Sequence, residues 1–420
     1  MKNKHSKMSS VLMAIVPIMT VVLVGYLVVG LALPVLPIFI NHELGFGTFV
    51  VGLVSSSQFA ASLLTRVWAG NYSDTRGPKQ AVMVGLIAAV VSGLIYLLSL
   101  HFLAQPILSA VILILGRGLL GGAASFIITG ALGWGLARVG AAHAGKVISW
   151  VGTAMYAAFA AGAPLGTVVY QRMGFAAVAG VTILFPLAAI LMVVFLHASE
   201  PQPRKPSSVA KVMKSIWLPG LGLAFSSIGF AAITTFIVLL FVDHGWGPLW
   251  LPFTAFAIAF MAPRTFLGHL TDKAGGARVA LISIVIEAAG LTMVRFAPSS
   301  VIALTGVVVC GLGYSLVYPG LGVEAVRSVP AENHGMAMGG FTAFLDVALG
   351  VSSPLLGLVG GWAGVPSIFL VSALLVVCGA PIAYHLGRQS LGSEVNDWEE
   401  YVESNTIEWF DPRIEDQSNQ

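Results

Sequence analysis

Long apolar runs recur along almost the whole chain, and short polar or Gly/Pro-containing breaks separate them. A run of about 20 apolar residues is long enough to cross the hydrocarbon core of a bilayer as a helix. The pattern therefore predicts an all-α membrane protein with twelve transmembrane helices. The expected helices cover residues 11–40, 48–69, 80–102, 107–136, 147–170, 175–197, 218–241, 249–268, 279–297, 300–319, 336–359 and 365–386.

One break is longer than the others and divides the expected helices into two groups of six. This segment, Ser199–Ser215, is basic and rich in Pro and Ser, which is typical of a linker. The C-terminal end carries nine of the 18 acidic residues, which is typical of a solvated tail. The expected units are an N-terminal six-helix bundle (1–198), a cytoplasmic linker (199–217), a C-terminal six-helix bundle (218–386) and an acidic cytoplasmic tail (387–420).

Composition and charge agree with a protein embedded in the lipid bilayer and predict its orientation. Hydrophobic residues make up 57% of the chain and charged residues only 9%, whereas soluble proteins carry about 25% charged residues. If the N-terminus is cytoplasmic, sixteen Lys and Arg residues fall on the cytoplasmic side and two, Arg172 and Arg295, on the outer side. Because basic residues favour the cytoplasmic side, both termini are expected in the cytoplasm.

The two groups of helices carry the same sequence patterns in the same order. The pattern Arg-x3-Gly-x3-Asp-x2-Gly occurs at Arg66–Gly77 and again, 198 residues later, at Arg264–Gly275. Residues 163–165 (Ala-Pro-Leu) align with residues 353–355 (Ser-Pro-Leu) at an offset of 190. These matches indicate an internal duplication. Parallel six-helix repeats are typical of transporters whose substrate site lies between the two halves.

The repeated pattern resembles the loop motif that follows the second helix in the major facilitator superfamily, Gly-x3-Asp-Arg-x-Gly-Arg-Lys. Thr75 and Pro78 stand where that motif has basic residues. The matching positions are Gly70, Asp74, Gly77 and Lys79 in the first copy, and Gly268, Asp272 and Gly275 in the second. The resemblance implies the major facilitator fold and a gating role for this loop.

Two further motifs extend the resemblance to the superfamily. Arg117 and Gly121 match an Arg-x3-Gly motif, and Gly162, Pro164 and Gly166 resemble a Gly/Pro-rich motif that is associated with antiporters. Longer stretches are similar to the bacterial YhhS/YfcJ-like subgroup of efflux permeases, among them 33–52, 128–136, 145–150 and 322–330. The resemblance implies efflux of a small molecule across the bacterial inner membrane.

An acidic residue in the loop motif needs a cation to meet, and Arg138 is the expected partner of Asp74. The repeat predicts a matching pair between Asp272 and Arg327. Such contacts would latch one side of the protein in one conformation and break in the other. Gly70 and Gly77 are expected to allow close helix approach and unusual backbone angles. The alternative, a loop that only fixes topology, explains the basic residues but leaves Asp74 and the glycines unexplained.

Three charged residues fall near the middle of expected helices, where a charge costs about 2.5–3.5 kcal/mol on insertion scales. Asp346 is the first candidate for proton coupling and Glu287 the second, because a carboxylate that alternates between environments can load and release a proton. Fixed structural contacts are the alternative for both carboxylates. Arg66 and Arg264 lie nearer the cytoplasmic loops, where their side chains could snorkel to the interface.

Arg117 is the main candidate for the central cavity, because the resemblance places its helix there. It would bind an anionic substrate group or tune a carboxylate, and a structural contact with a buried polar group is the alternative. Four weaker candidates are more simply explained by packing or interface anchoring. They are Tyr26, Gln58, Tyr314 and Tyr318.

Several classes of function have no support in the sequence. No GxxxxGK[ST] loop, HExxH motif or nucleophile–base arrangement occurs, so we expect no ATP-driven motor, metal site, cofactor or enzyme activity, and no nucleic-acid partner. The expected function is proton-coupled export of a sugar, metabolite, siderophore or drug by a monomer. An uptake symporter or facilitator on the same fold remains open, as does a sensor or scaffold that acts through the acidic tail.

Overall fold

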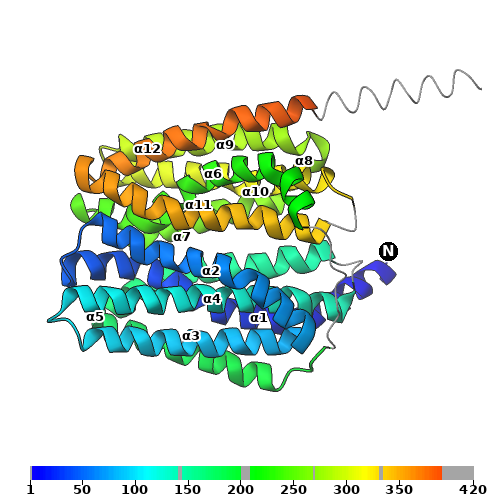
Figure 1. Ribbon diagram of the computed structural model, residues 1–420, viewed down its shortest axis with the longest axis horizontal. Helices are drawn as coiled ribbons and strands as arrows, with labels where there is room; N and C mark the ends of the chain where they lie inside the picture. Colours follow the sequence, from blue (N-terminus) through cyan, green and yellow to red (C-terminus); the bar gives the residue numbers. More distant parts are fainter. Residues whose placement is uncertain (1, 141–143, 200–208, 268–269, 331–333, 390–420) are drawn as a thin grey trace, which may run out of the picture.

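The computed structural model describes residues 2–140, 144–199, 209–267, 270–330 and 334–389. All regular secondary structure in these ranges is helical. The helices lie side by side along the long direction of the molecule (Figure 1). Helices that satisfy their own backbone hydrogen bonds are one of the two structures that can span a bilayer.

The first half of the chain forms the lower group of helices, blue to green in Figure 1. Gly174 has φ 75° and ψ −177°, so the longest helix, α5, is interrupted there. The chain reverses direction at this point (Figure 1). The helices are α1 (Lys2–Ile38), the π-helical turn η1 (Phe39–Glu43), α2 (Thr48–Arg76), α3 (Pro78–Leu100), α4 (Pro106–Val139) and α5 (Ala144–Val194).

The second half forms the upper group, green to orange in Figure 1. Its helices are α6 (Val209–Asp243), α7 (Leu251–Phe266), α8 (Leu270–Lys273), α9 (Gly276–Arg295), α10 (Ser300–Arg327), α11 (His334–Ala363) and α12 (Val365–Val377). Within each half the helices pack mainly on one another, for example α3 on α4 and α9 on α10. Each half therefore has a helical core of its own.

The predicted fold class, an all-α membrane protein, is confirmed. Ten of the described helical segments are long and apolar enough to cross a bilayer. One of the ten contains both parts of α5, which correspond to the expected helices 147–170 and 175–197. The shorter α7 corresponds to the expected helix 249–268. The expected count of twelve is therefore reached only when α5 is counted as two crossings and α7 as a further one.

Residues of the loop motif belong to a helix, which corrects the expected turn over Gly70–Lys79. Helix α2 continues to Arg76, and α3 begins directly at Pro78. Only Gly77 between them leaves the helical conformation, with φ 101°. The hydropathy of the sequence shows where a helix leaves the bilayer. The backbone hydrogen bonds of the helix can continue beyond that point, so the helix extends into water. Helix α6 likewise begins at Val209, inside the expected linker, while residues 200–208 and 390–420 lie outside the described chain.

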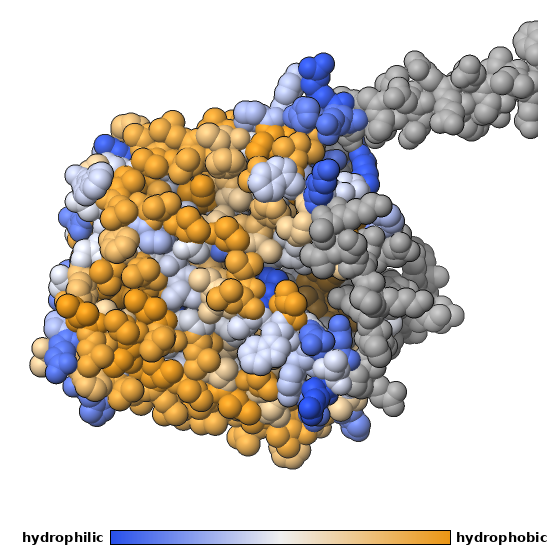
Figure 2. All heavy atoms as spheres, in the orientation of Figure 1, coloured by the Kyte–Doolittle hydropathy of each residue, from blue (hydrophilic) through white to orange (hydrophobic). Residues whose placement is uncertain are grey.

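The outer surface of the bundle is apolar, as contact with lipid requires. Large apolar side chains are exposed on many helices, including Leu64 and Val67 on α2, Leu184 on α5 and Val301 on α10. Figure 2 shows orange residues over most of one face and blue residues gathered toward its two ends. A bilayer would cover the orange band and leave the two ends in water.

The two halves meet mainly along two helix pairs, α2 with α11 and α5 with α7, and α1 also contacts α6. On the first pair, Thr48 Oγ1 donates to the carbonyl oxygen of Gly357 at 2.6 Å. On the second, Thr254 Oγ1 donates to the carbonyl oxygen of Ala160 at 2.8 Å. A Cβ added at Gly52 would lie 2.7 Å from the carbonyl carbon of Ser353, so small residues allow α2 and α11 to approach closely.

Candidate functional site

An ion pair joins the two halves at the α2–α11 contact. Arg66 Nε donates to Asp346 Oδ2 at 2.9 Å, and Arg66 Nη2 contacts the same oxygen. The side chain of Asp346 is 4% exposed and that of Arg66 is 26% exposed. Among the side chains that the structure describes, which do not include that of Asp272, no other ion pair is present. The expectation that Arg66 snorkels to the interface is therefore wrong, because a buried carboxylate of the other half holds it.

Arg264 occupies the equivalent place at the α5–α7 contact. Its Nε donates to the carbonyl oxygen of Ser315 at 3.1 Å. Its guanidinium carbon lies 4.1 Å from the ring centroid of Phe260, 5.4 Å from that of Tyr156 and 5.9 Å from that of Tyr318. Of these rings, only Tyr156 comes from the first half. Arg264 therefore lies in an aromatic cage that both halves build, rather than snorkelling.

The internal repeat relates the two arginines and their partners. Arg66 and Arg264 occupy equivalent positions of the repeat at the offset of 198, and Tyr156 and Asp346 occupy equivalent positions at the offset of 190. Each arginine thus contacts the equivalent position of the other half. Arg66 meets the carboxylate of Asp346 there, and Arg264 meets the phenol ring of Tyr156. One contact between the halves is an ion pair, and its counterpart is a cation–π contact.

Two of the candidate tyrosines lie close to these contacts. Tyr26 donates from its hydroxyl to the carbonyl oxygen of Ala124 at 2.9 Å. Its ring centroid lies 6.0 Å from that of Phe159, which lies 5.7 Å from that of Tyr156. The hydroxyl of Tyr318, part of the Arg264 cage, lies 2.8 Å from Thr342 Oγ1.

The other two candidates are enclosed. Tyr314 is buried, and its hydroxyl lies 3.2 Å from Ser227 Oγ. Gln58 is buried, and its Oε1 has no hydrogen-bond partner in the described chain. Tyr26 is as buried as Gln58, and the Tyr314 ring centroid lies 5.4 Å from that of Phe230 and 5.5 Å from that of Phe260. Of the four candidates, Tyr318 is the least buried.

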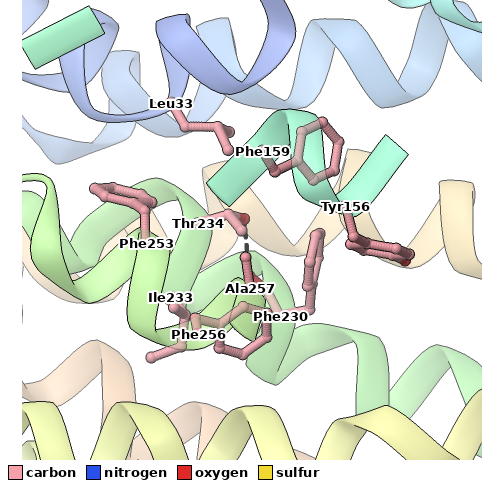
Figure 3. A pocket seen from close by; sticks show the side chains of 9 residues that line it. All are labelled: Leu33, Tyr156, Phe159, Phe230, Ile233, Thr234, Phe253, Phe256 and Ala257. Atoms are coloured by element: carbon pink, nitrogen blue, oxygen red, sulfur yellow. Dashed lines mark hydrogen bonds between the residues drawn. The ribbon is translucent and has the colours of Figure 1, made fainter. Parts of the chain in front are cut away.

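A small apolar pocket lies between the halves next to the Arg264 cage. Aromatic side chains dominate its wall, and Tyr156 belongs to both the pocket and the cage (Figure 3). The cavity measures about 20 Å³, which is room for about one water molecule. Its lining residues are Leu33 of α1, Tyr156 and Phe159 of α5, Phe230, Ile233 and Thr234 of α6, and Phe253, Phe256 and Ala257 of α7.

Arg117 of α4 is 3% exposed. Its Nε and Nη1 atoms have no hydrogen-bond partner within the described chain. The neighbouring Gly121 packs on α2, where an added Cβ would overlap the backbone of Gln58. The Arg-x3-Gly motif thus places an arginine with unused donors inside the first half, at a site where α2 and α4 are in close contact.

Glu287 of α9 lies inside the second half and away from the contact between halves. Ser226 Oγ donates to its Oε2, whereas Oε1 has no hydrogen-bond partner in the described chain. Gly229 and Gly313 also pack against Glu287: a Cβ added at Gly229 would overlap its Oε1, and one added at Gly313 would overlap its backbone nitrogen. All three neighbours belong to α6 and α10. The structure therefore does not bring the two candidate carboxylates, Glu287 and Asp346, together.

A family model of the Major Facilitator Superfamily matches residues 18–278 and residues 250–411. The chain belongs to the major facilitator superfamily. Similar relatives include the uncharacterized MFS-type transporter STM4428 of Salmonella typhimurium, which is 40% identical over 365 residues, or 87% of this chain and 94% of the relative. The uncharacterized MFS-type transporter YhhS of Escherichia coli K12 is 41% identical over 87% of this chain and 90% of its own.

Solved structures of the superfamily share the fold at low sequence identity. A mutant of the nucleoside transporter NupG aligns with a TM-score of 0.72 and 14% identity, over 88% of this chain and 99% of NupG. As a superfamily member, the protein is a multi-pass membrane transporter of small molecules.

The Gly/Pro-rich motif of α5, Gly162 to Gly166, packs closely against α1. An added Cβ at Gly162 would lie 2.7 Å from the Leu27 carbonyl oxygen, and one at Gly166 would overlap the Leu31 backbone. Pro164 lies between these glycines in the same helix. Both glycines therefore have a packing reason inside the first half.

The loop motif makes different contacts from those expected. In the described chain no ion pair joins Asp74 to Arg138. Arg138 lies over the Trp134 ring, 5.6 Å from its centroid, and its Nη2 donates to the carbonyl oxygen of His197 at 3.5 Å. The predicted latch pair is therefore not formed in this conformation. The matching pair of Asp272 with Arg327 involves a side chain, that of Asp272, which the structure does not describe, and Gly268 lies outside the described residues.

The other residues of the loop motif have clear structural roles. Lys79 Nζ donates to the carbonyl oxygens of Leu196, at 2.6 Å, and Val194, at 3.1 Å, so it ties the start of α3 to the end of α5. Gly77 and Gly275 both adopt positive φ angles, 101° and 85°, which favour glycine. Gly70, in contrast, has no neighbouring atom within 4 Å of an added Cβ, so the close helix approach expected there is wrong.

Proposed function

We propose that this transporter is a proton-coupled exporter of a small molecule that works by alternating access in the bacterial inner membrane. In this proposal it acts as a monomer, with both termini in the cytoplasm. The observation that carries the proposal is the ion pair between Arg66 and Asp346, because it connects a titratable group of one half to the other half.

Protonation of Asp346 would weaken the contact between the halves. At about 4 Å and an effective dielectric constant of about 20, two unit charges attract each other by about 4 kcal/mol. Moving a two-state equilibrium from about 1% to about 99% takes about 5.5 kcal/mol. Loss of the ion pair therefore supplies a large part of the free energy that switches the two halves. A proton that binds Asp346 would release α2 from α11.

Export is favoured over uptake by Gly162, Pro164 and Gly166, the antiporter-like positions of α5. The residues with unused donors or acceptors take secondary parts in this proposal. Arg117 meets an anionic group or a moving carboxylate at another step of the cycle, since two of its nitrogens lack partners within the described chain. Glu287, enclosed in the second half, is the second candidate for proton coupling.

The experiment begins with a thermal-shift screen of the purified protein against sugars, siderophore-like chelators and drugs, because a ligand of the native state raises its apparent stability. A hit is then offered to proteoliposomes with an imposed pH gradient. An antiporter accumulates the hit when the lumen is more acidic than the bath, whichever way the protein inserts. A symporter accumulates it with the opposite gradient, and a facilitator does so with neither.

Asp346→Asn is the decisive variant, since it keeps the size of the side chain and removes the titratable charge. We expect its accumulation in acid-lumen vesicles to fall to the level seen without a gradient, while thermal shifts still report folded protein. Asp243→Asn, at the exposed end of α6, is the matched control and should accumulate like the wild type. Accumulation by Asp346→Asn equal to that of the wild type would refute the proposal.

A further inference from the structure

The guanidinium of Arg264 holds an unbalanced positive charge at the contact between the halves. Its Nε donates a hydrogen bond to the carbonyl oxygen of Ser315. Its two terminal nitrogens have no hydrogen-bond or ion-pair partner among the described residues. A guanidinium stays protonated in proteins, so this charge persists at every pH at which the protein is folded.

The aromatic cage orients this charge without neutralising it. The guanidinium carbon lies 4.1 Å from the ring centroid of Phe260, and the ring centroids of Tyr156 and Tyr318 lie further away, at 5.4 Å and 5.9 Å. Cation–π contacts attract a guanidinium through the face of a ring and leave its N–H groups free to donate. That fork of donors matches the two oxygens of a carboxylate or sulfonate.

The equivalent arginine shows why the charge at Arg264 needs a partner from outside the protein. Arg66 is balanced by Asp346. At the equivalent position of the first half stands Tyr156, which offers a ring and no negative charge. Half-buried arginines at a low-dielectric contact are stable when an anion accompanies them. The missing counter-charge is the part that a substrate could supply.

The surroundings of the free donors specify the rest of the substrate. Tyr156 is shared with the apolar pocket, whose wall continues through Phe256, stacked on Phe260 with ring centroids 6.2 Å apart. Figure 3 shows that the rings around the pocket come from α5, α6 and α7. A flat apolar body next to the acid group would contact rings on both halves at once.

We infer that the substrates are organic monoanions with an apolar, preferably aromatic body, and that Arg264 binds their acid group. This inference rests on the proposed transport function and assigns its substrate class. The acid group takes both terminal nitrogens of Arg264. The body lies along Tyr156, Phe230 and Phe256 in a conformation in which this cavity, with room here for about one water molecule, is wider. A bound substrate then bridges the two halves at the site where the protein itself lacks a carboxylate.

The test measures binding to the full-length protein in detergent, with no pH gradient, using three probes of similar shape. These are naphthoate, the neutral naphthamide and the cationic naphthylmethylammonium. We expect naphthoate to bind about tenfold or more tightly than the other two, because only it forms charge-assisted hydrogen bonds. Equal binding of naphthoate and naphthamide, or no binding of any probe, would overturn the inference without any variant.

Variants then locate the site. Arg264→Gln should remove the preference for naphthoate, and Arg264→Lys should keep part of it. The exposed Arg172→Gln carries the same chemical change elsewhere and should bind like the wild type. Tyr156→Asp copies position 346 and should also abolish naphthoate binding, because the new carboxylate would neutralise Arg264 from within. A preference for naphthoate that survives both Arg264→Gln and Tyr156→Asp would place the site elsewhere.

These measurements are separate from those of proton coupling. A protein that prefers naphthoate but shows no gradient-driven accumulation would retain the Arg264 site and lose the proposed exporter function. A protein that accumulates its ligand in acid-lumen vesicles yet binds naphthoate and naphthamide equally would keep the exporter function and lose the substrate class.

Discussion

Gly357→Ala tests whether the close contact of α2 with α11 holds the two halves in the conformation of this structure. Gly357 lies near the end of α11, where its carbonyl oxygen accepts a hydrogen bond from Thr48. A Cβ added here would overlap the Thr48 carbonyl oxygen and lie 2.8 Å from the Cα of Phe49. Both are backbone atoms of α2. Neither can rotate away, so the helices must separate.

The size of the effect follows from this overlap. Overpacking a well-packed contact costs about 1–3 kcal/mol. The cost falls only on the conformation in which α2 touches α11 at this end. A coupling free energy of about 1–3 kcal/mol corresponds to a shift of about 5–150-fold in an equilibrium. We therefore expect Gly357→Ala to raise, by a factor in this range, the population of molecules in which α2 and α11 are separated near Thr48 and Gly357.

Gly361→Ala is the matched control, one helical turn further along α11. Its added Cβ would lie 3.7 Å from Thr48 Oγ1, an ordinary van der Waals distance. Both substitutions gain about the same helix propensity, about 1 kcal/mol of preference for Ala over Gly. A difference between the two variants therefore reports the overlap rather than the stiffness of the helix.

Distances between spin labels at His42 and Trp362 measure the opening, since both residues are exposed near the ends that meet. The exposed Cys378 is first replaced by Ala, whereas the buried Cys310 can stay. We expect Gly357→Ala to add a longer distance that is minor in the wild type and in Gly361→Ala. Identical distance distributions in all three proteins would show that this contact does not control the conformation.

Three further predictions concern the buried charges and the loop glycines. Arg66→Leu should lower the free energy of unfolding by about 3–5 kcal/mol, because it leaves a buried carboxylate unpaired. The exchange of Arg66→Asp with Asp346→Arg should recover most of this loss in thermal unfolding; no recovery would contradict a direct pair. Glu287→Gln should lower gradient-driven accumulation less than Asp346→Asn does, since its carboxyl group is enclosed by the second half, and an equal or larger loss would make Glu287 the main coupling residue. Gly77→Ala should destabilise the protein by about 1–2 kcal/mol through its positive φ, whereas Gly70→Ala, with open space around it, should not.

The sequence predicted most helix positions because apolar runs and helix starts coincide. Expected starts at 48 and 300 agree with α2 and α10. Ends were less accurate: the polar residues Asn71–Arg76 stay helical in α2 although they leave the apolar run. Polarity reports the environment of a residue, and helical hydrogen bonding does not depend on a bilayer.

The partners of the charged residues could not be predicted in the same way. Arg66 and Asp346 are 280 residues apart, and their pairing depends on how one six-helix half packs on the other. Nothing in the local sequence distinguishes Arg66 from a snorkelling arginine. The repeat did contain a usable signal, because the offset of 198 aligns Arg66 with Arg264 and the offset of 190 aligns Tyr156 with Asp346. Applying both offsets together would have shown that the two halves differ at this position.

Because the two halves differ at positions 156 and 346, the two contacts between them have different chemistry. Identical halves would place the same partner opposite Arg66 and Arg264, and both contacts would respond alike to a proton. In the proposed coupling, the carboxylate at 346 is the group that gains and loses the proton, because a phenol at 156 has an ordinary pKa of about 10. Only the α5–α7 contact leaves a guanidinium for an anion. Because both contacts connect the same two rigid halves, a proton at one and an anion at the other would act on a single conformational equilibrium. No carboxylate then needs to touch the substrate for the two to be coupled.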